Sequence, residues 1–103
     1  MTPVAMRLAE ATAGDFLPHL ATGFTVMSGP DRVAILELRE ATELAPGEGG
    51  RRPPFSLIFF GPTDPALQQG IYALSHAELG DFEIFLVPVG ANRESRRYQA
   101  IFN

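Results

Sequence analysis

Three apolar runs between positions 54 and 89 constrain the fold more than any other feature of this sequence. Such runs are typical of strands, and here glycine, proline and aspartate separate them. They cover residues 55–60, 71–75 and 82–89, and Pro88 predicts a bulge or strand end within the third. The first and third runs carry apolar side chains on both faces, so we expect both faces to be shielded from water. The connections are short, which favours antiparallel pairing.

A short helix is predicted ahead of these runs. Thr12 is a good N-cap, and Asp15 would lie near the positive end of the helix. Pro18 is tolerated only in a first turn, so the helix begins either at Thr12, with a distortion, or at Asp15. Gly23 is its expected end. Three apolar side chains share one face and must dock onto the sheet, namely Phe16, Leu17 and Leu20.

Three further strands bring the predicted total to six. Residues 24–27 and 97–103 form short strands, and residues 33–38 begin a longer strand whose second half is polar. The glycine- and proline-rich stretch 45–53 is interpreted as a mobile loop. The predicted fold is mainly β (α+β). It is a single domain over residues 1–103, a mostly antiparallel barrel-like or sandwich domain with one short N-terminal helix at its side or end.

Composition narrows the functional classes. The chain has 103 residues, 46% hydrophobic content and a formal net charge of -4, which argue for a globular protein and against nucleic acid as its partner. The absence of cysteine excludes disulfides, thiolate zinc sites and thiol nucleophiles. No apolar run reaches the roughly 18 residues that cross a membrane, and none near the N-terminus has signal-peptide length. We therefore expect a cytoplasmic protein with no membrane partner.

Short segments along the second half of the chain form a recognisable pattern. They are Pro54-Phe55-Ser56-Leu57, Phe60-Gly61-Pro62, Gln69-Gly70-Ile71-Tyr72-Ala73-Leu74 with His76, Glu78-Leu79-Gly80, Phe85-Leu86-Val87-Pro88-Val89-Gly90 and Tyr98-Gln99-Ala100-Ile101-Phe102-Asn103. With them the chain, from the Thr12 helix onward, resembles a family of short bacterial proteins of unknown function. The resemblance implies a small β-rich domain without an assigned activity, associated with genes for phage-tail-like, tail-collar surface proteins. It implies no catalytic or ligand residues.

Candidate metal ligands are few. The two imidazoles are His19, with Asp15 nearby, and His76, which a metal site would combine with Glu78 or Asp81. The sequence has no HxH or HxxxH pair, so a hydrogen-bonded turn histidine is the favoured interpretation. We predict no metal site and no cofactor.

Catalytic residues are not predicted either. The serines, none of which lies in a GxSxG elbow, are Ser28, Ser56, Ser75 and Ser95. Ser75 and His76 are neighbours in a strand and therefore face opposite sides. The acidic side chains of the long polar strand, Glu37, Glu40 and Glu43, lie where no burial is expected to raise a pKa. These observations favour a protein that is not an enzyme.

Two arginine-containing stretches do not predict anion binding. Residues 47–52 are rich in glycine, but a P-loop needs a lysine and a following helix, and here two prolines and a strand follow. The other stretch carries Arg93, Arg96 and Arg97. It lies beside Tyr98, which the strand alternation buries, so no stacking platform for nucleic acid is expected.

Association with a protein partner, or with a second copy of the chain, is the favoured function. One apolar sheet face would contain the interface candidates Phe60, Phe85, Val87, Val89 and Ile101. A two-turn helix cannot cover six strands, so the excess is either hidden by closure of the sheet or exposed as a partner surface. The alternative is a small-ligand-binding protein or enzyme that uses a pocket at a barrel mouth. Its polar groups would be Glu37, Arg39, Tyr72 and His76.

Overall fold

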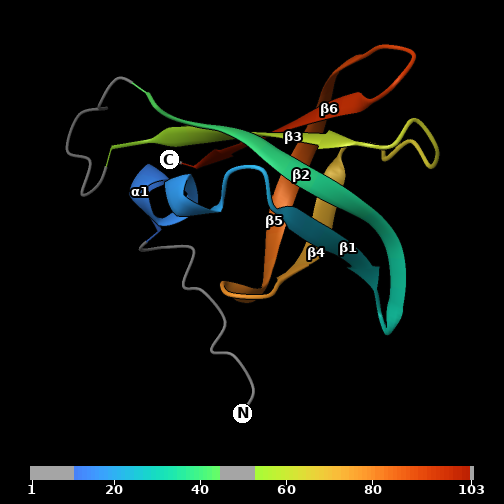
Figure 1. The fold of residues 1–103 in the computed structure, drawn as a ribbon, viewed down its shortest axis with the longest axis horizontal. Helices are drawn as coiled ribbons and strands as arrows, with labels where there is room; N and C mark the ends of the chain where they lie inside the picture. The colour runs from blue at the N-terminus through green and yellow to red at the C-terminus, as the bar shows by residue number, and fades with distance from the viewer. Residues whose placement is uncertain (1–10, 45–52, 103) are drawn as a thin grey trace.

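Six antiparallel strands close into a barrel in the computed structural model, which describes residues 11–44 and 53–102 (Figure 1). The strands are β1 Gly23–Ser28, β2 Asp31–Glu43, β3 Phe55–Gly61, β4 Gly70–His76, β5 Gly80–Ala91 and β6 Arg96–Phe102. Their order around the barrel is β1-β2-β3-β6-β5-β4, and pairing of β4 with β1 closes it. The predicted fold class is confirmed, and the barrel is the correct choice of the two arrangements.

The connections explain this strand order. Short turns make hairpins of β1 with β2, of β4 with β5, and of β5 with β6. The longer connection after β3 carries the chain across one end of the barrel to β4, so β3 pairs with β6 instead. All strand neighbours are antiparallel, as the predicted short connections require.

Alternate side chains of every strand fill the interior. In β5 the residues Phe82, Ile84 and Leu86 point inward and are buried, while the residues between them are not. Aromatic rings account for much of the core, and the rings of Phe55 and Phe102 stack with centroids 4.5 Å apart. Burial of these apolar side chains supplies the main force that holds the barrel closed.

A short helix plugs one end of the barrel. Helix α1 spans Ala13–Phe16 and continues as a 3-10 turn over Leu17–His19, which matches the predicted position. The Thr12 backbone N–H donates to the Asp15 carboxylate at 2.8 Å, as the predicted cap requires. Phe16 is fully buried among the rings that end β3 and β6. Ala13 is buried with it, so one turn of helix closes this end of the barrel with two side chains.

Two expectations for this helix are wrong. Leu17 and Leu20 were expected to dock beside Phe16, but they are 47% and 38% exposed. The helical turn buries Ala13 and Phe16, and the chain then continues as a 3-10 turn in which no residue is buried. Gly23 does not end the helix but begins β1; the reversal occurs at Ala21, whose φ is 66° and whose N–H donates to the Leu38 carbonyl at 2.7 Å.

The β3–β4 connection closes the opposite end. Leu67 is buried, and its backbone N–H donates to the Tyr98 hydroxyl at 2.9 Å inside the barrel. Gly61 lies next to the Tyr98 ring, and a Cβ at this position would lie only 2.5 Å from Leu36 Cδ2. Glycine is required at that position by close packing. The barrel is thus filled with side chains and capped at both ends.

The expectation that β5 would be shielded on both faces is wrong. Closure of the barrel covers only the inner face, and the helix lies at the end instead of over the wall (Figure 1). Phe85 and Val89, on the outer face, are 48% and 49% exposed. The bulge predicted at Pro88 is confirmed, because the register between β5 and β6 shifts between Pro88 and Gly90.

Some sequence expectations lie outside the described residues. These concern residues 1–10 of the predicted single domain, residues 45–52 of the predicted loop, and the final residue of the last predicted strand. Within the described part of the chain, no helix has the length and apolar character to cross a membrane.

Candidate functional site

The outer wall of the barrel carries an apolar surface centred on β5. We call it the β5 face and define it by the outward-facing apolar side chains of β4, β5 and β6, which are Ile71, Phe85, Val87, Val89 and Ile101. Ile71 and Phe85 are direct cross-strand partners and are 70% and 48% exposed. Val87 lies opposite Gln99, and Ile101 lies two residues further along the same side of β6, 55% exposed. Ile71 and Phe85 thus lie side by side on β4 and β5, and Ile101 lies on β6 beyond the last residue pair of the β5–β6 ladder.

Phe60, the fifth interface candidate, occupies a different environment. It is on the outer wall, on β3, but it is half-buried. The Arg39 guanidinium lies 4.6 Å from its ring centroid, and the Arg97 guanidinium lies 6.0 Å away on the other side. Cation–π contacts of this kind stabilise both partners. Phe60 is therefore covered by arginines from β2 and β6 and separated from the β5 face.

Ile71, the most exposed large apolar residue on the described surface, was not among the candidates. A signal for it was present in the sequence. The tight connection after His76 sets His76 opposite Gly80, and counting back along both strands pairs Ile71 with Phe85. Applying hairpin geometry to residues 71–85 would have added Ile71 to the interface candidates.

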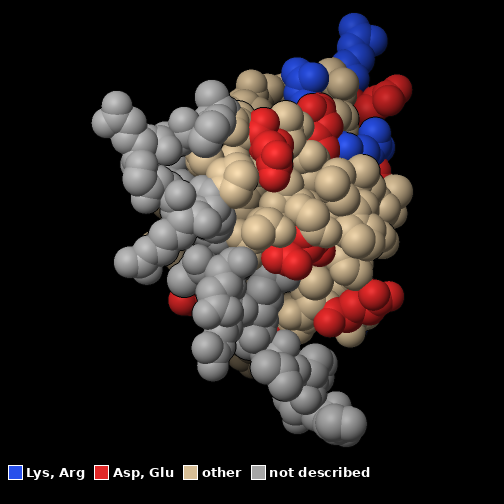
Figure 2. Space-filling view, turned by 90° about the vertical axis from the view of Figure 1, so that its left-hand side faces the viewer, with Lys and Arg blue, Asp and Glu red and all other residues tan. Residues whose placement is uncertain are grey.

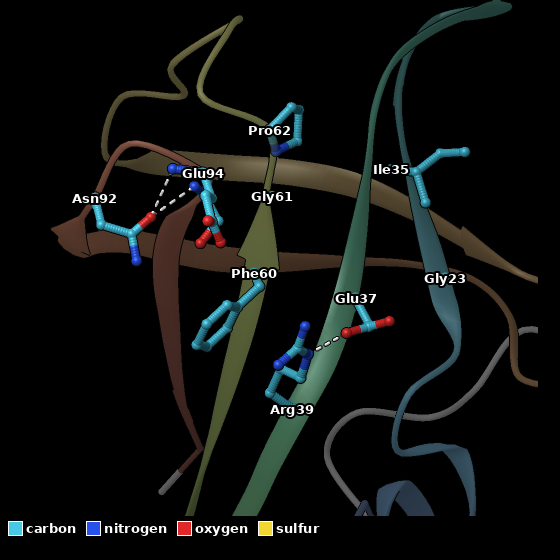
Figure 3. A pocket seen from close by; sticks show the side chains of 10 residues that line it. Gly23, Ile35, Glu37, Arg39, Phe60, Gly61, Pro62, Asn92 and Glu94 are labelled. Carbon is cyan, nitrogen blue, oxygen red and sulfur yellow. Dashed lines mark hydrogen bonds and ion pairs between the residues drawn. The ribbon is translucent and has the colours of Figure 1, made fainter.

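A cleft of about 790 Å³ lies next to Phe60, between β2 and the β5–β6 hairpin (Figure 3). Its lining residues are Gly23, Ile35, Glu37, Arg39, Phe60, Gly61, Pro62, Asn92, Glu94 and Ser95. In Figure 3, Arg39 points along the wall toward Phe60 and forms an ion pair with Glu37. The Asn92 side chain is also occupied, because its Oδ1 accepts the Glu94 and Ser95 backbone N–H groups at 2.8 Å each. The cleft is on the outer wall and not at a barrel mouth.

Charged side chains are unevenly distributed around the barrel. Figure 2 shows arginines gathered at the upper edge of the face drawn there, whereas acidic side chains extend to its centre and lower edge. The β5–β6 hairpin and β6 supply three of the described arginines. Arg96 is held by a hydrogen bond from Nε to the Thr63 carbonyl at 2.8 Å. Tyr98 is buried inside the barrel, as the alternation predicted.

His76 has a structural role, because both nitrogens of its ring form hydrogen bonds within the protein. It is 6% exposed, and its Nδ1 accepts the backbone N–H groups of Glu78 and Leu79 at 3.1 Å each. The proton is therefore on Nε2, which donates to the Thr22 hydroxyl at 2.9 Å; that hydroxyl donates to the His19 carbonyl at 2.6 Å. The hydrogen-bonded turn histidine expected from the sequence is what the geometry shows, with no lone pair left for a metal.

Burial sets the charge state of His76. Desolvation lowers its pKa below the ordinary value of 6.5, the nearby His19 lowers it further, and Glu78 raises it to a smaller extent. The His19 and His76 rings meet edge to face with centroids 4.8 Å apart, and His19 Nδ1 lies 3.7 Å from Glu78 Oε2. Among residues 11–44 and 53–102, no three histidine, cysteine or acidic side chains are grouped as metal ligands.

Comparison with known families decides where this chain belongs. Residues 11–102 match a family that is described as a domain of unknown function, DUF6916. The chain belongs to the DUF6916 family. The resemblance to an uncharacterised domain family is therefore confirmed for nearly the whole chain. Comparison with curated proteins gives no significant match, and neither does comparison with solved structures.

The DUF6916 fold separates the four polar residues proposed for a barrel-mouth pocket. Glu37 and Arg39 lie on the outer wall in the cleft. Tyr72 and His76 belong to β4 and face the interior. The Tyr72 hydroxyl donates to the Gln68 carbonyl at 2.6 Å, and His76 is enclosed near the helix end. The four side chains do not converge on one site.

The other candidates in this DUF6916 domain are also dispersed. Ser75 is half-exposed while His76 is buried, which fits their predicted opposite orientation. Asp15 is used in the helix cap. The remaining serines and strand carboxylates are distributed over different strands and turns, and they are Ser28, Ser56, Ser95, Glu40 and Glu43.

Proposed function

We propose that this domain is a non-enzymatic protein-interaction module whose partner binds the β5 face. The observation that carries the proposal is the exposure of the cross-strand neighbours Ile71 and Phe85, with Ile101 also exposed on the next strand of the barrel. Scattered apolar side chains are common on protein surfaces, but a contiguous group on one sheet face is typical of an interaction site. The aromatic side chain at its centre belongs to a residue class that often anchors interfaces.

The topology supports binding through a face. Each of the six strands pairs with a neighbour on both sides along at least part of its length, so no strand is a free edge along its whole length. A partner that adds a strand needs an open sheet edge. Closure of the barrel therefore favours association through the side chains of the outer wall, and the β5 face offers the apolar surface for it.

We further propose that the module is an accessory of a larger surface or phage-tail-like assembly. This role follows from the gene context that the resemblance implies and is compatible with a small domain that presents one apolar surface. In the source cells, the chain is expected to sediment with the assembly on a gradient. Phe85→Glu places a charge at the centre of the face and is expected to release it. A natural chain that does not sediment with the assembly would contradict the role, and a variant that still does would contradict binding through the β5 face.

A second candidate is a ligand site in the outer-wall cleft. Its volume of about 790 Å³ is in the range of small-molecule sites. Arg39 and Glu37 supply charged groups there, and Phe60 supplies an apolar surface. The candidate predicts that a small-molecule library screened by ligand-observed NMR gives binders that Arg39→Met abolishes. Binders that are unaffected by this substitution would contradict it.

The proposal is tested by cysteine labelling, because the natural chain has no cysteine. Ile71→Cys places a single thiol on the β5 face, and Ile35→Cys is a matched control on β2, where the isoleucine is 57% exposed. Each variant is expressed at native level in the source cells, and maleimide labelling is compared between fresh lysate and dilute purified protein. We expect labelling at position 71 to be about tenfold slower in lysate, with no difference at position 35. Equal rates at both positions would contradict a bound partner.

A further inference from the structure

We propose that the occupant of the β5 face is a second copy of this chain, bound so that β5 of one copy runs antiparallel to β5 of the other. This inference rests on the proposed function, because it names the partner of the same surface. It is carried by the order of charges along β5. The strand is acidic at one end, apolar in the middle and covered by an arginine at the other end.

The acidic end precedes the apolar centre. Asp81 and Glu83 are exposed and point outward from β5. Their cross-strand partners on β4 are Ser75 and Ala73, which are too small to cover them. Within the described ranges, neither carboxylate forms an ion pair. Both are available to a cation from outside the chain.

The basic end follows the apolar centre. Arg97 belongs to β6 and pairs with Gly90 of β5. An ideal Cβ built at Gly90 would lie 2.6 Å from Arg97 Nη2, so the guanidinium lies directly over β5. The residues that the structure describes provide no carboxylate in ion-pair contact with it. The Arg97 guanidinium therefore lies over β5, the strand that carries the two acids, although Arg97 itself belongs to β6.

The two ends lie on either side of the middle of the face. The point midway between Asp81 and Glu83 is four residues before Leu86. Gly90 is four residues after Leu86, but the bulge takes up one of them, so Gly90 lies about three strand steps away. At roughly 3.4 Å per residue, the acidic end lies about 14 Å from Leu86 and the basic end about 10 Å. A two-fold axis that lies in the interface and crosses β5 close to Leu86 therefore brings the acidic and basic ends within reach of each other's long side chains.

This symmetry brings each arginine to the acidic end of the other copy. Arg97 of each copy faces the acidic end of the other, which gives two equivalent ion-pair clusters. Between them, Phe85 of one copy packs against Val87 of the other, with the sheets about 10 Å apart as in other face-to-face packings. Parallel stacking of the two β5 strands would set acids against acids and arginine against arginine. Like charges in contact oppose such an arrangement, so the charge order specifies the antiparallel one.

The test uses two charge reversals in the full chain. Sedimentation equilibrium over a concentration series is expected to show that the natural chain dimerises. Arg97→Glu and Glu83→Arg are each expected to weaken the dimer about tenfold or more, because each reversal acts at both ends of the interface. Arg32→Glu and Glu43→Arg make the same charge changes on exposed positions of β2 and are expected to leave the dimer within about twofold.

Mixing the two weakened variants distinguishes this geometry from other associations. In a mixed dimer of Arg97→Glu with Glu83→Arg, each reversed charge faces its opposite. The equimolar mixture is therefore expected to recover heterodimers with nearly natural affinity. An affinity no better than that of either variant alone would overturn the antiparallel arrangement.

The outcome also separates this inference from the proposed function. A natural chain that stays monomeric at all concentrations, with Ile71→Cys still protected in lysate, overturns the second copy and leaves another protein as partner. A monomeric chain whose Ile71→Cys is fully reactive in lysate overturns both. Dimerisation that Phe85→Glu and the charge reversals leave unchanged places the contact elsewhere and overturns the inference.

Discussion

The inner and outer faces of β5 both carry large apolar side chains, but these side chains have different roles. On the inner face, Ile84 and Leu86 are 4% and 0% exposed. On the outer face, Phe85 and Val89 are about half exposed. From Ile84 onward both sides of the strand carry apolar side chains, but only one side packs against the rest of the barrel. Hydrophobicity alone therefore does not separate residues that stabilise the fold from residues that can bind a partner.

The polar groups of the interior have partners within the protein, whereas charged groups on the outer face of β5 lack an ion-pair partner in the portion of the chain that the structure describes. Inside, both nitrogens of the His76 ring have partners in the protein. Outside, Asp81, Glu83 and Arg97 have no ion-pair partner among the described residues. The interior is complete by itself, as buried polar groups must be. The outer face of β5 is completed, in our proposal, by a second molecule.

Truncation inside the barrel is expected to have the largest effect on stability. Leu86→Ala should lower the free energy of unfolding by about 2–5 kcal/mol, because it removes buried methyl groups and leaves a cavity. Urea denaturation measures the change. If this variant does not fold, Ile84→Val should still show about 0.5–1.5 kcal/mol. A loss below about 0.5 kcal/mol for Leu86→Ala would contradict the packed interior.

A decrease in pH is expected to lower the free energy of unfolding by a smaller amount, through the buried side chain of His76. Burial lowers the pKa of His76, so the unfolded chain binds this proton more readily than the folded chain. Its contribution to stability is complete above the ordinary pKa of 6.5 and is lost as pH falls from there through the lowered pKa of the folded state. His76→Asn keeps an acceptor for the two backbone N–H groups but does not titrate. As the pH decreases below 6.5, the natural chain should lose more stability than the variant. Parallel profiles of stability against pH would show that the titration of His76 does not affect stability.

Truncation on the outer face is expected to have the smallest effect on stability and a clear one on association. Phe85→Thr retains a residue that favours strands and should change the free energy of unfolding of the dilute monomer by no more than about 0.5 kcal/mol. In sedimentation equilibrium, the same substitution should weaken the dimer. A stability loss comparable to that of Leu86→Ala would show that the two faces of β5 are equivalent after all.

Much of the fold was predictable because it depends on local patterns. Each of the six strands follows from an apolar run bounded by turn residues, and the capped helix follows from Thr12 and Asp15. Short connections gave the antiparallel hairpins. The pairing of β3 with β6 was not predictable in this way, because it joins segments separated by two other strands. The same holds for Leu17 and Leu20, whose exposure depends on the angle at which the helix meets the barrel.

The candidate site was predictable only in part. Alternation along β5 and β6 placed Phe85, Val87, Val89 and Ile101 on one side of the sheet. The separation of Phe60 depends on Arg39, which the bulge in β2 directs over its ring. No sequence pattern indicates that contact, because the two residues belong to strands joined by a long connection.

By itself, the amino-acid sequence determined which segments become strands, which side chains share a face, and the turn role of His76, because these features depend on neighbours in the chain. Only the tertiary structure decided which face of β5 is hidden and that an arginine from β6 lies over Gly90 of β5. Closure brings distant strands together, and the sheet can bury one side only. The surface left outside, with its order of charges, is therefore a property of the closed barrel and not of any single segment.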